Sequence, residues 1–590
     1  MYTSKMKSVE TPITSWDAIQ WNLIKRYVVK MQQRIFKATK EGNKRKMRGL
    51  QRLLMRSEAA LLLSIRTVTQ INKGKRTAGI DGYKAITAKE RLKLFHNMRT
   101  HSISVHNPRA VKRVYIKKSS GKLRPLGIPT YKDRVYQNVV KLALEAEWEA
   151  KFESTSYGFR PARGCHDAIE AIYNKLVGGK KQWVFEGDFK GCFDNLNHEY
   201  ILDTISTSPA KKVIAKWLNA GYVDNGAFFS TERGTPQGGI ISPLLANIAL
   251  HGMEEAIGVK YKRTNTKRSG EAFVIKGSRT VVRYADDFVV ICETKEEAEG
   301  MYDMLKPYLH TRGLELAHEK TRVVHATEGF DFLGFNIRRY MNGGIKERKS
   351  KLFVKPAKKA VHEVMKTLKE TIRAFYGKNT EKLIPRLNQI LRGVANYWSP
   401  EVSKKTFTKV DNYMIKLIYQ YLKSSHPNKS WTWRRKQYFK KPTFGKSQNK
   451  WVFTCPKTGR QLEKLEWKAI VRHDLIKHNH SPLNPKLKDY FEKRSIKQFV
   501  RDSVEVYKKL AKKQGYVCTL CGHSLLGDEG VERHHKIPRK PHGGDNSLKN
   551  QQLVHTSCHI EHHKKYPAVG YIPTDAEVAK DRYERHKVYH

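Results

Sequence analysis

Two adjacent acidic residues, Asp286 and Asp287, stand between two apolar runs that have the composition of β-strands. We expect these runs to form a β-hairpin that carries both carboxylates at its tip. Like charges repel each other at such a tip, and a divalent cation removes the repulsion because Mg²⁺ prefers carboxylate oxygens. An isolated Asp-Asp pair is more often a simple turn, so the pair by itself does not establish a metal site.

A second aspartate strengthens the interpretation of a metal site. Asp188 follows the apolar run 184–187, as Asp286 follows the run 281–285. If two neighbouring strands bring Asp188 beside Asp286, their carboxylates can bind two metal ions. In such a centre one metal activates a 3′ hydroxyl and the other stabilises the leaving pyrophosphate. The pattern therefore predicts nucleotidyl transfer.

The end of the chain carries a separate group of metal-ligand residues. Two residues separate Cys518 from Cys521, and two separate His555 from Cys558. Thiolate and imidazole pairs at this spacing form tetrahedral zinc sites. Only 7 cysteines occur in 590 residues, which does not suggest a disulfide scaffold. We therefore predict a structural Zn²⁺ ion.

Hydrophobic periodicity indicates the elements that must position these residues. Residues 15–73 are predicted to be helical, with Ser15 or Thr14 as a possible N-cap. One apolar face of this helical region is formed by Ile24, Val28, Met31 and Ile35. Strands are expected at 111–117 and 281–291, and helical patterns at 132–151, 156–177 and 350–425. Residues 431–436 indicate a boundary or an irregular basic segment.

The charge balance points to a polyanionic partner. The chain has 113 Lys and Arg against 56 Asp and Glu, a net charge of +57. Such an excess is costly through self-repulsion, and binding to phosphates relieves it while counterions are released. No apolar window is long enough to span a membrane, and the first residues do not resemble a signal peptide. We expect no membrane partner and a location in the bacterial cytoplasm near the nucleoid, or in an organellar matrix.

Several motifs, in the right order, resemble those of reverse transcriptases encoded by group II introns. Residues 284–287 (YADD) resemble the catalytic box, and the run from Asp188 resembles the upstream palm motif. The other matching blocks are 123–129 (LRPLGIP), 157–161 (YGFRP), 233–243 (RGTPQGGIISP), 313–321 (GLELAHEKT) and 332–335 (FLGF). The resemblance implies an RNA-directed DNA polymerase with fingers and palm.

The resemblance also implies residue roles in the polymerase. Asp188, Asp286 and Asp287 would bind two Mg²⁺ ions. Phe193 matches the position where an aromatic ring crowds a 2′ hydroxyl and selects dNTPs by shape, although a packed core phenylalanine is the alternative. The remaining nucleotide-binding candidates are Arg124 and Lys122 at the triphosphate, Gln237 in the pocket and Lys320 near the leaving phosphate. Charged loop residues of this kind are often simply solvated.

The histidine-rich end resembles the HNH endonuclease family, whose ββα fold holds a divalent metal ion against the scissile phosphate. His535 matches the general base of that family, and Asn550 the residue that orients the loop or the base. The matching metal-ligand positions are His534, His559 and His563. The pair Gln551-Gln552 departs from the family, in which an apolar residue commonly follows the asparagine. A structural zinc knuckle without nuclease activity is the alternative.

The segment 387–398 resembles the thumb, or maturase, region of intron-encoded proteins. Arg392, Tyr397 and Trp398 offer a basic group and aromatic rings suited to RNA contact, although aromatics at helical spacing are more often core. We predict an α+β right-hand polymerase with an α-helical thumb and a C-terminal ββα-metal domain. The expected divisions are an N-terminal extension (1–110), fingers and palm (111–345), thumb and maturase region (346–430), basic DNA-binding region (431–504) and HNH domain (505–590).

The implied function is that of a mobile group II intron. The protein would bind intron RNA and assist its splicing, nick the second strand of a double-stranded DNA target, and copy the RNA from that 3′ end during retrohoming. Two alternatives remain. One is a reverse transcriptase of a defence or diversity system, against which the maturase-like helix and the fused HNH module argue. The other is a splicing-only maturase, against which the intact aspartates argue.

Overall fold

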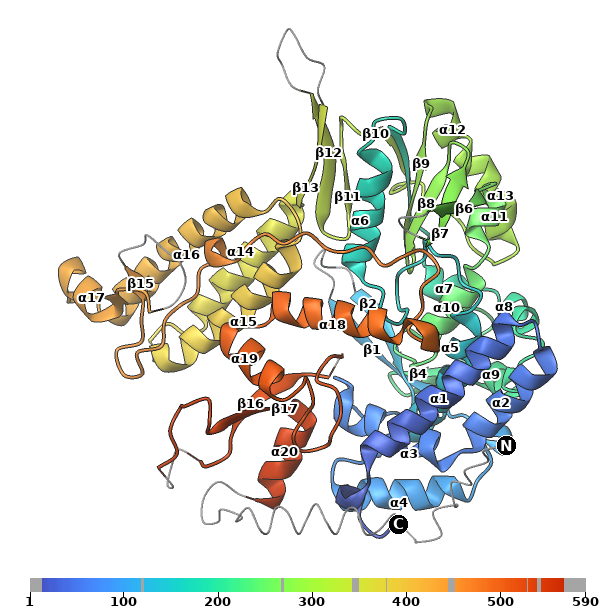
Figure 1. Ribbon diagram of the computed structural model, residues 1–590, viewed down its shortest axis with the longest axis horizontal. Helices are drawn as coiled ribbons and strands as arrows, with labels where there is room; N and C mark the ends of the chain where they lie inside the picture. Colours follow the sequence, from blue (N-terminus) through green and yellow to red (C-terminus); the bar gives the residue numbers. More distant parts are fainter. Residues whose placement is uncertain are drawn as a thin grey trace.

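The computed structural model describes residues 13–117, 121, 123–266, 270–341, 350–377, 379–443, 451–527, 529–538 and 543–566. Lys122 lies outside these residues. Figure 1 shows helices of the N-terminal part at the lower right, a sheet region above them, a helical arm at the left and the C-terminal elements at the lower centre. Within the part of the chain that the structure describes, no helix is long and apolar enough to cross a membrane.

The N-terminal region is helical, as the sequence predicts. Its helices are α1 (Trp21–Lys40), α2 (Lys44–Arg56), α3 (Glu58–Arg66) and α4 (Ala88–Arg99). The first three pack with α5 (Tyr131–Trp148), and α4 packs with α3. Val28, Met31 and Ile35 are buried on α1, which confirms the predicted apolar face. Ser15 caps only the short 3-10 turn Trp16–Ala18, whereas α1 itself begins after Gln20 without a side-chain cap.

A four-stranded fingers sheet follows, in the order β2-β1-β4-β5. Its strands are β1 (Val111–Lys117), β2 (Leu123–Ile128), β4 (Tyr222–Asp224) and β5 (Ala227–Phe229). β1 coincides with the strand predicted from the sequence. The loop 234–239 packs on β2, where the amide of Gly127 donates to the carbonyl of Gln237 over 2.8 Å. The sheet therefore holds this loop in place.

The palm contains a second four-stranded sheet in the order β10-β3-β9-β8, with antiparallel neighbours. Its strands are β3 (Trp183–Gly187), β8 (Thr280–Tyr284), β9 (Asp287–Cys292) and β10 (Arg322–His325). Both faces are covered: Val184 and Val289 belong to the cluster that includes residues of α6 (Cys165–Leu176), whereas Phe185 and Val290 belong to the opposite cluster. Burial on both faces fixes the register, because a slip by one residue would exchange the two faces.

Short elements surround this sheet. They are α7 (Cys192–Asn195), α8 (His198–Thr204), α9 (Lys211–Leu218), α10 (Ser242–Ala249), α11 (Met253–Ala256), the hairpin β6 (Lys260–Thr266) and β7 (Gly270–Lys276), α12 (Lys295–Glu299) and α13 (Met301–His310). The helical pattern predicted for 156–177 is only partly right, since α6 begins at Cys165. Residues before it form a loop because Ser156 pairs as a β-bridge with Arg283 of the palm hairpin.

The thumb begins with strands rather than helices. β11 (Phe330–Phe332), β12 (Phe335–Met341) and β13 (Ser350–Pro356) form a sheet, and α14 (Lys358–Arg373), α15 (Thr380–Trp398) and α16 (Lys404–Ser425) follow. The prediction of a helical 350–425 is therefore wrong for 350–356. Leu352 and Val354 alternate with less buried neighbours and face the core beside β12, which is strand periodicity.

The described residues of 431–504 form a folded strap that runs from the thumb over the palm. The strap contains α17 (Trp431–Tyr438), β14 (Phe439–Lys440), β15 (Val452–Phe453), 3-10 turns at Leu465–Trp467 and Pro485–Leu487, and α18 (Lys488–Asp502). The expected irregularity at 431–436 is wrong, because Ser430 caps a regular helix there. The strap crosses the molecule in Figure 1 and ends at the C-terminal elements α19 (Glu505–Lys513), β16 (Val531–His535), β17 (Gln551–His555) and α20 (Thr556–Lys565).

One buried carboxylate fastens the strap to the palm. Asp167, on α6, is only 2% exposed, and one of its oxygens accepts hydrogen bonds from His473, Arg494 and the amide of Ile476 over 2.7–3.0 Å. The other oxygen accepts from the amide of Gly164 at the start of α6. Burial would raise the pKa of Asp167, but the bond from His473 and the charges of His473 and Arg494 outweigh it and lower the pKa.

Replacing Asp167 with alanine should release the strap. His473 and Arg494 would lose their shared acceptor in a mostly buried place, which costs about 3 kcal/mol. Amide hydrogen exchange of residues 472–494 should accelerate strongly, while that of β3 and β9 stays unchanged. Asp203→Ala serves as the control, because the Asp203 carboxylate is exposed and its salt bridge is to the partly exposed Lys211. Unaltered exchange of the strap in Asp167→Ala would contradict this account.

Candidate active sites

The palm sheet brings Asp188 to the tip of the β8–β9 hairpin. Gly187 of β3 pairs with Phe288 of β9, and Tyr284 pairs with Asp287 across the hairpin. Asp188 therefore leaves its strand beside the hairpin tip that carries Asp286 and Asp287. The close pairing requires glycine at 187, because a Cβ atom there would lie 2.1 Å from the ring of Phe288. The predicted hairpin with both aspartates at its tip is confirmed.

A buried arginine holds the hairpin tip in its conformation. Arg283 is 1% exposed, and its guanidinium donates to the carbonyl of Ala285 over 3.1 Å and to the Oδ1 of Asn247 over 3.0 Å. Ala285 has a φ of 58°, in the left-handed region that L-residues rarely adopt. Gly158 lies against this turn, where a Cβ would come within 2.4 Å of the Ala285 amide. Asn247 in turn donates to the carbonyl of Gly158 over 2.8 Å, so the 157–161 loop and α10 both support the tip.

The acidic groups at the tip influence one another. Removal from bulk water by the surrounding protein, followed by the charges of Asp286 and Asp188, raises the pKa of Asp287 to about 6. The ammonium of Lys320 lies 2.9 Å from Asp188, and this bond raises the pKa of Lys320. Among the described residues, the three aspartates are not gathered to within 4.8 Å of one another, unlike the two His and Cys groups described below. The aspartates repel one another, and Lys320 already pairs with one of them. This arrangement fits a site in which bound cations balance the remaining negative charge.

The candidate nucleotide-binding residues fall into two places. Arg124 on β2 donates to Gln237 over 2.7 Å, and Gln237 donates to Asp194 over 3.2 Å, which links the fingers sheet to the turn after Asp188. Phe193 lies beside Asp194 in the short helix α7, is 8% exposed, and its carbonyl accepts from the amide of Thr235. Lys320 lies with the aspartates instead. Sequence reasoning did not single out Asp194, although it stands in the same short helix as Phe193.

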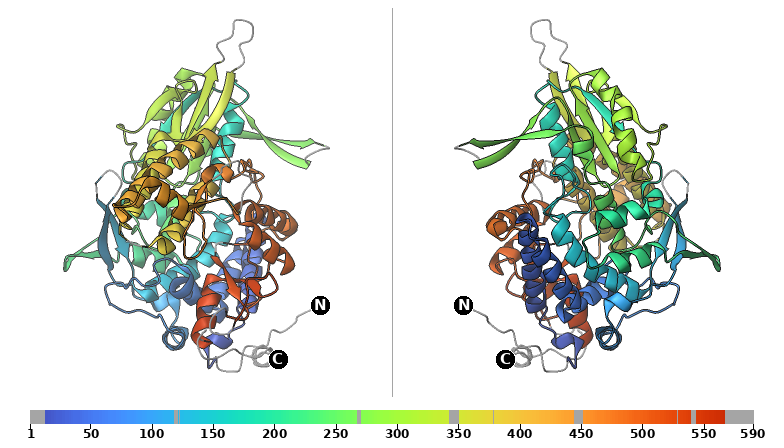
Figure 2. Two further views of the ribbon diagram at one scale, coloured as in Figure 1. Left: turned by 90° about the vertical axis from the view of Figure 1, so that its left-hand side faces the viewer. Right: turned by 90° about the vertical axis from the view of Figure 1, so that its right-hand side faces the viewer.

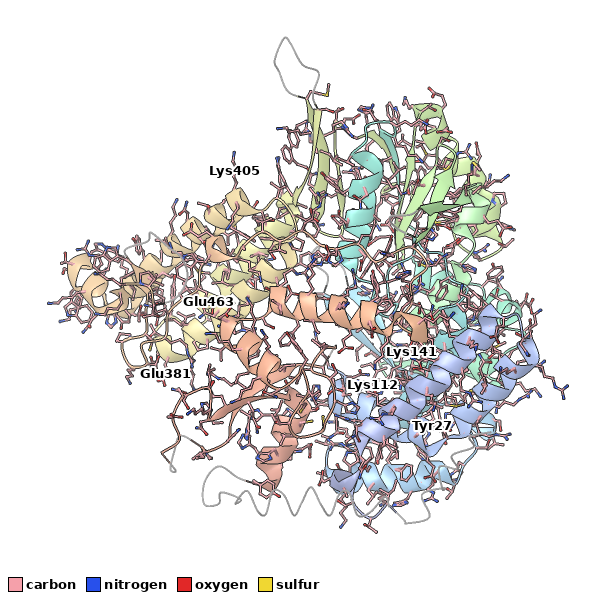
Figure 3. The ribbon with its side chains drawn as sticks, in the orientation of Figure 1. Tyr27, Lys112, Lys141, Glu381, Lys405 and Glu463 are labelled. Atoms are coloured by element: carbon pink, nitrogen blue, oxygen red, sulfur yellow. The ribbon has the colours of Figure 1, made fainter. Side chains whose placement is uncertain are left out.

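The thumb residues differ in what they can contact. Trp398 is 2% exposed, so of the two alternatives open from the sequence it is a core residue and not an RNA contact. Tyr397 is half-buried, stacks on Phe335 with 5.2 Å between ring centroids, and donates its hydroxyl to the carbonyl of Leu333. Arg392 is exposed and pairs with Glu463 of the strap, which Figure 3 labels beside the thumb helices. The aromatic pair thus builds the thumb, and only Arg392 faces solvent.

The C-terminal domain has the expected ββα arrangement, in which β16 pairs with β17 and α20 follows directly. His534, His559 and His563 bring ring nitrogens within 4.8 Å of one another. His534 is 4% exposed, and burial followed by its histidine neighbours lowers its pKa to about 3, so its ring is neutral and able to ligate a metal. The Nδ1 of His559 donates to Glu532 over 2.6 Å, while its Nε2 lies 3.0 Å from the Nε2 of His563. This donor set fits a divalent ion.

His535 points away from that triad because successive residues of a strand face opposite sides. Its Nε2 lies 3.0 Å from the Oδ1 of Asn546. Because an amide oxygen can only accept a hydrogen bond, the neutral ring carries its proton on Nε2, and Nδ1 keeps a lone pair. Asn550 bonds to both backbone groups of Ile537 and to the carbonyl of Asp545, so it closes the loop rather than touching His535. Sequence reasoning missed Asn546, which stands in the Gly-Gly-Asp-Asn run of the same loop. Gln551 is buried and donates to the carbonyl of Asn546, which explains a polar residue at this position.

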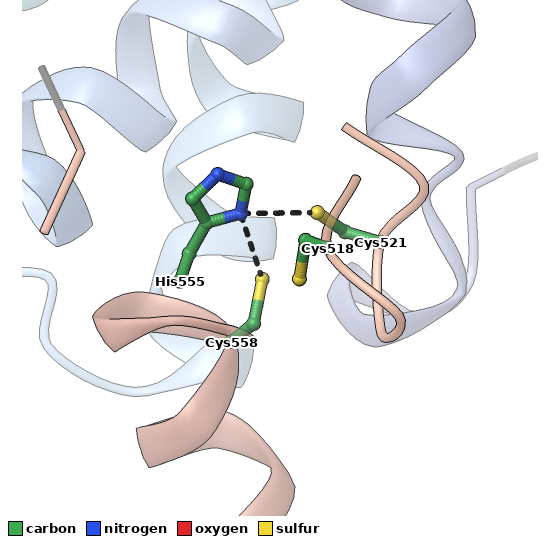
Figure 4. Close-up of side chains that lie close together, drawn as sticks. All are labelled: Cys518, Cys521, His555 and Cys558. Carbon is green, nitrogen blue, oxygen red and sulfur yellow. Dashed lines mark hydrogen bonds between the residues drawn. The ribbon is translucent and has the colours of Figure 1, made fainter. Parts of the chain in front are cut away.

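A second cluster gathers the predicted zinc ligands. Cys518, Cys521, His555 and Cys558 present their ligand atoms within 4.8 Å of one another, and Figure 4 shows all four side chains converging. The Nε2 of His555 donates to the carbonyl of Ser524, which leaves Nδ1 facing the thiols at 3.3 Å from Cys521 and 3.9 Å from Cys558. This donor set fits a tetrahedral zinc ion. The surrounding apolar cluster is small, so a bound metal would add much of the domain's stability.

Four family models match successive parts of the chain. Residues 116–337 match the reverse transcriptase (RNA-dependent DNA polymerase) family, and residues 16–98 match the N-terminal domain of reverse transcriptase. Residues 361–439 match the group II intron maturase-specific domain, and residues 518–565 match the HNH endonuclease family. The matched regions follow one another in the order expected from the sequence.

Individual relatives point the same way. The chain is 31% identical over 406 residues to the group II intron-encoded protein LtrA of Lactococcus lactis, which covers 55% of this chain and 66% of that protein. It is 34% identical over 318 residues to protein YkfC of Escherichia coli, covering 49% of this chain and 84% of that one. A telomerase from Candida albicans overlays with a TM-score of 0.31 at 14% identity, over 57% of this chain and 61% of that chain, too distant to inform the sites.

The carboxylates at the palm hairpin, the histidine triad on a ββα fold and the maturase-specific segment between them are thus found together in one chain. The chain belongs to the family of group II intron-encoded proteins, and it combines a reverse transcriptase domain, a maturase-specific domain and an HNH endonuclease domain.

Proposed function

We propose that this chain is an active RNA-directed DNA polymerase whose metal centre is formed by Asp188, Asp286 and Asp287. The observation that carries the proposal is the placement of Asp188 beside a hairpin tip that a buried Arg283 holds fixed. Two Mg²⁺ ions at these carboxylates would supply charge stabilisation for the attacking and leaving oxygens. The protein contributes the rigid spacing of the carboxylates, and the ammonium of Lys320 lies close enough to approach a leaving phosphate.

The incoming nucleotide would lie between the palm tip and the fingers sheet. Arg124, whose guanidinium suits phosphate oxygens, would bind the triphosphate together with Lys122. Gln237 would line the pocket, where it already bridges Arg124 and Asp194. Phe193 would form the wall that excludes a 2′ hydroxyl, and its position in the short helix α7, shortly after Asp188, supports this role.

We propose that the HNH domain nicks DNA with His535 as the general base. The lone pair that Asn546 leaves on Nδ1 of His535 supports the assignment. His534, His559 and His563 would hold one divalent ion, while Asn550 keeps the loop in place. A structural Zn²⁺ ion that stabilises the domain would be bound by Cys518, Cys521, His555 and Cys558.

The partners that follow are intron RNA, a double-stranded DNA target and dNTPs. In this proposal the RNA inserts into one DNA strand, the HNH domain nicks the other, and the palm copies the RNA from the new 3′ end. The maturase-specific match favours an intron over a defence or diversity system. The palm aspartates favour polymerisation over splicing alone. The net charge of +57 supports binding to nucleic acid throughout.

The domain divisions at about residues 110, 345, 430 and 504 remain a proposal, as does the place of action. Relatives occur in bacteria and in the yeasts Schizosaccharomyces pombe and Saccharomyces cerevisiae. We propose that the protein works where its intron is transcribed, in the bacterial cytoplasm near the nucleoid or in an organellar matrix.

The palm assignment predicts that Asp286→Asn abolishes primer extension on an RNA template with Mg²⁺. The substitution keeps the side-chain shape but removes one ligand charge, so we expect a rate loss on the order of a thousandfold or more. The measurement is single-turnover extension of a supplied primer. Asp303→Asn, at an exposed position of α13, is the control and should extend normally. Near wild-type extension by Asp286→Asn would place the catalytic centre elsewhere.

If the ring of Phe193 excludes the 2′ hydroxyl, Phe193→Ala should admit ribonucleotides. Loss of the ring removes the steric contact with a 2′ hydroxyl, which is worth on the order of 1–3 kcal/mol of discrimination, or about tenfold to a hundredfold. The readout is the ratio of kcat/KM for dNTP and rNTP. Phe193→Tyr keeps the ring and should keep the preference. If the ratio does not move in Phe193→Ala although dNTPs are still incorporated, the ring is simply core packing.

The nuclease assignment predicts that His535→Ala eliminates second-strand nicking but preserves primer extension and splicing, because His535 lies in a separate metal-binding domain. Three parallel assays on one preparation measure these activities. His96→Ala, which alters an exposed histidine of α4, serves as the control. Normal nicking by His535→Ala would refute its role as base, and loss of extension as well would show that the domains are not independent.

A further inference from the structure

The HNH domain, which follows the strap, packs against the N-terminal helices. Figures 1 and 2 both place the C-terminal elements beside α1–α4, although these segments are separated by most of the chain. A cavity of about 320 Å³ between them is lined from both sides, by residues that include Trp16, Trp21 and Gln70 and by the Cys521–Gly522 turn. The two regions therefore share an interface.

Two arginines of the N-terminal helices are buried at this interface. Arg91 of α4 is 3% exposed, and its guanidinium lies 3.3 Å from the carboxylate of Glu561 on α20. Arg66 of α3 is 4% exposed and lies 3.7 Å from Glu529, just before β16. The charged heads of long side chains are seldom buried unless they are paired. Each arginine thus pairs with a carboxylate of the nuclease domain, and Arg91 also donates to the carbonyl of Ile86.

The zinc-binding turn takes part in the same contact. Gly522, in the turn that carries Cys518 and Cys521, lies against the start of α1, because a Cβ atom on it would come within 3.7 Å of the side-chain nitrogen of Asn22. The guanidinium of Arg66 also stacks over the ring of Trp21 at 4.8 Å. The start of α1 therefore lies between an arginine anchor and the turn that carries Cys518 and Cys521.

We propose that the N-terminal helices are the docking platform of the HNH domain, that Arg66 and Arg91 are its two anchors, and that this docking sets where the second DNA strand is cut. A nuclease on a loose tether would sample many distances from the polymerase site, whereas a docked one is held at a single distance. The proposal rests on the proposed nuclease function, but it assigns the choice of cutting position to residues that lie outside the nuclease.

Docking also raises the effective concentration of the nuclease at its target. A flexible tether supplies an effective concentration of only about millimolar, whereas docking holds the nuclease at one distance from its target. Neither arginine touches the histidine triad or the palm aspartates, so their removal should alter nicking without altering primer extension. Arg66 and Arg91 are therefore positioning residues and take no part in the chemistry.

The test compares the full chain with the variants Arg66→Gln, Arg91→Gln and the double variant. Hydrogen exchange on the protein alone reports docking, through the amides of residues 16–22 and 518–524. Mapping of nick positions, with the protein bound to its intron RNA and a target duplex, reports function. Arg99→Gln is the matched control, because Arg99 also lies on α4 but pairs with Glu58 of its own region at a well-exposed position. A charge exchange, Arg91→Glu with Glu561→Arg, tests the pairing directly.

We expect faster exchange on both sides of the interface in the double variant, together with about tenfold slower nicking at scattered positions and normal primer extension. The charge exchange should restore much of the docking that Arg91→Glu alone loses. Unchanged exchange would overturn the docking assignment, and faster exchange with nicks at wild-type positions would overturn its role in choosing the cut. If the wild-type protein does not nick DNA, the proposed nuclease function fails, while hydrogen exchange still decides whether the anchors dock the domain.

Discussion

The polymerase site depends on one buried charge, the guanidinium of Arg283. One terminal nitrogen of this guanidinium donates to both the carbonyl of Ala285 and the side-chain Oδ1 of Asn247, and a buried charge is costly unless it is hydrogen-bonded. Those two bonds draw the hairpin tip, the 157–161 loop and α10 to one point. The left-handed Ala285 and the close approach of Gly158 follow from this convergence. Arg283 therefore positions the aspartates at the tip although it is itself buried.

Buried hydrogen bonds and ion pairs also join other parts of the chain. Asp167 gathers His473, Arg494 and a backbone amide to hold the strap on the palm. Asp411 of α16 accepts from the amides of Leu465 and Glu466 to hold the strap on the thumb. Arg66 and Arg91 meet carboxylates of the HNH domain. Buried polar groups carry a penalty unless they are satisfied, so each of these contacts favours one relative arrangement of the parts it joins.

The sequence alone determined the local features that carry chemistry. The β8–β9 hairpin follows from apolar β-formers on both sides of Asp286 and Asp287. The zinc candidates follow from the spacing of Cys518, Cys521, His555 and Cys558, all of which converge. Adjacent spacing also placed His534 and His535 together, but only the strand β16 turned one toward the triad and the other toward Asn546. Patterns with a short period are visible in a sequence because neighbours along the chain remain neighbours in space.

Tertiary structure decided everything that joins distant segments. Residues 350–356 lie at the start of the helical pattern predicted for 350–425, but pairing with β12 makes them a strand. Packing places Trp398 in the core and so removes it as a candidate for RNA contact. Asp194 is linked to the candidate nucleotide pocket only because the fold brings the loop that carries Gln237 against it. No local signal marks Arg66 or Arg91 as partners of residues more than 450 positions away. The physical reason is that burial and ion pairing depend on which surfaces meet, and that is settled by the packing of the whole chain.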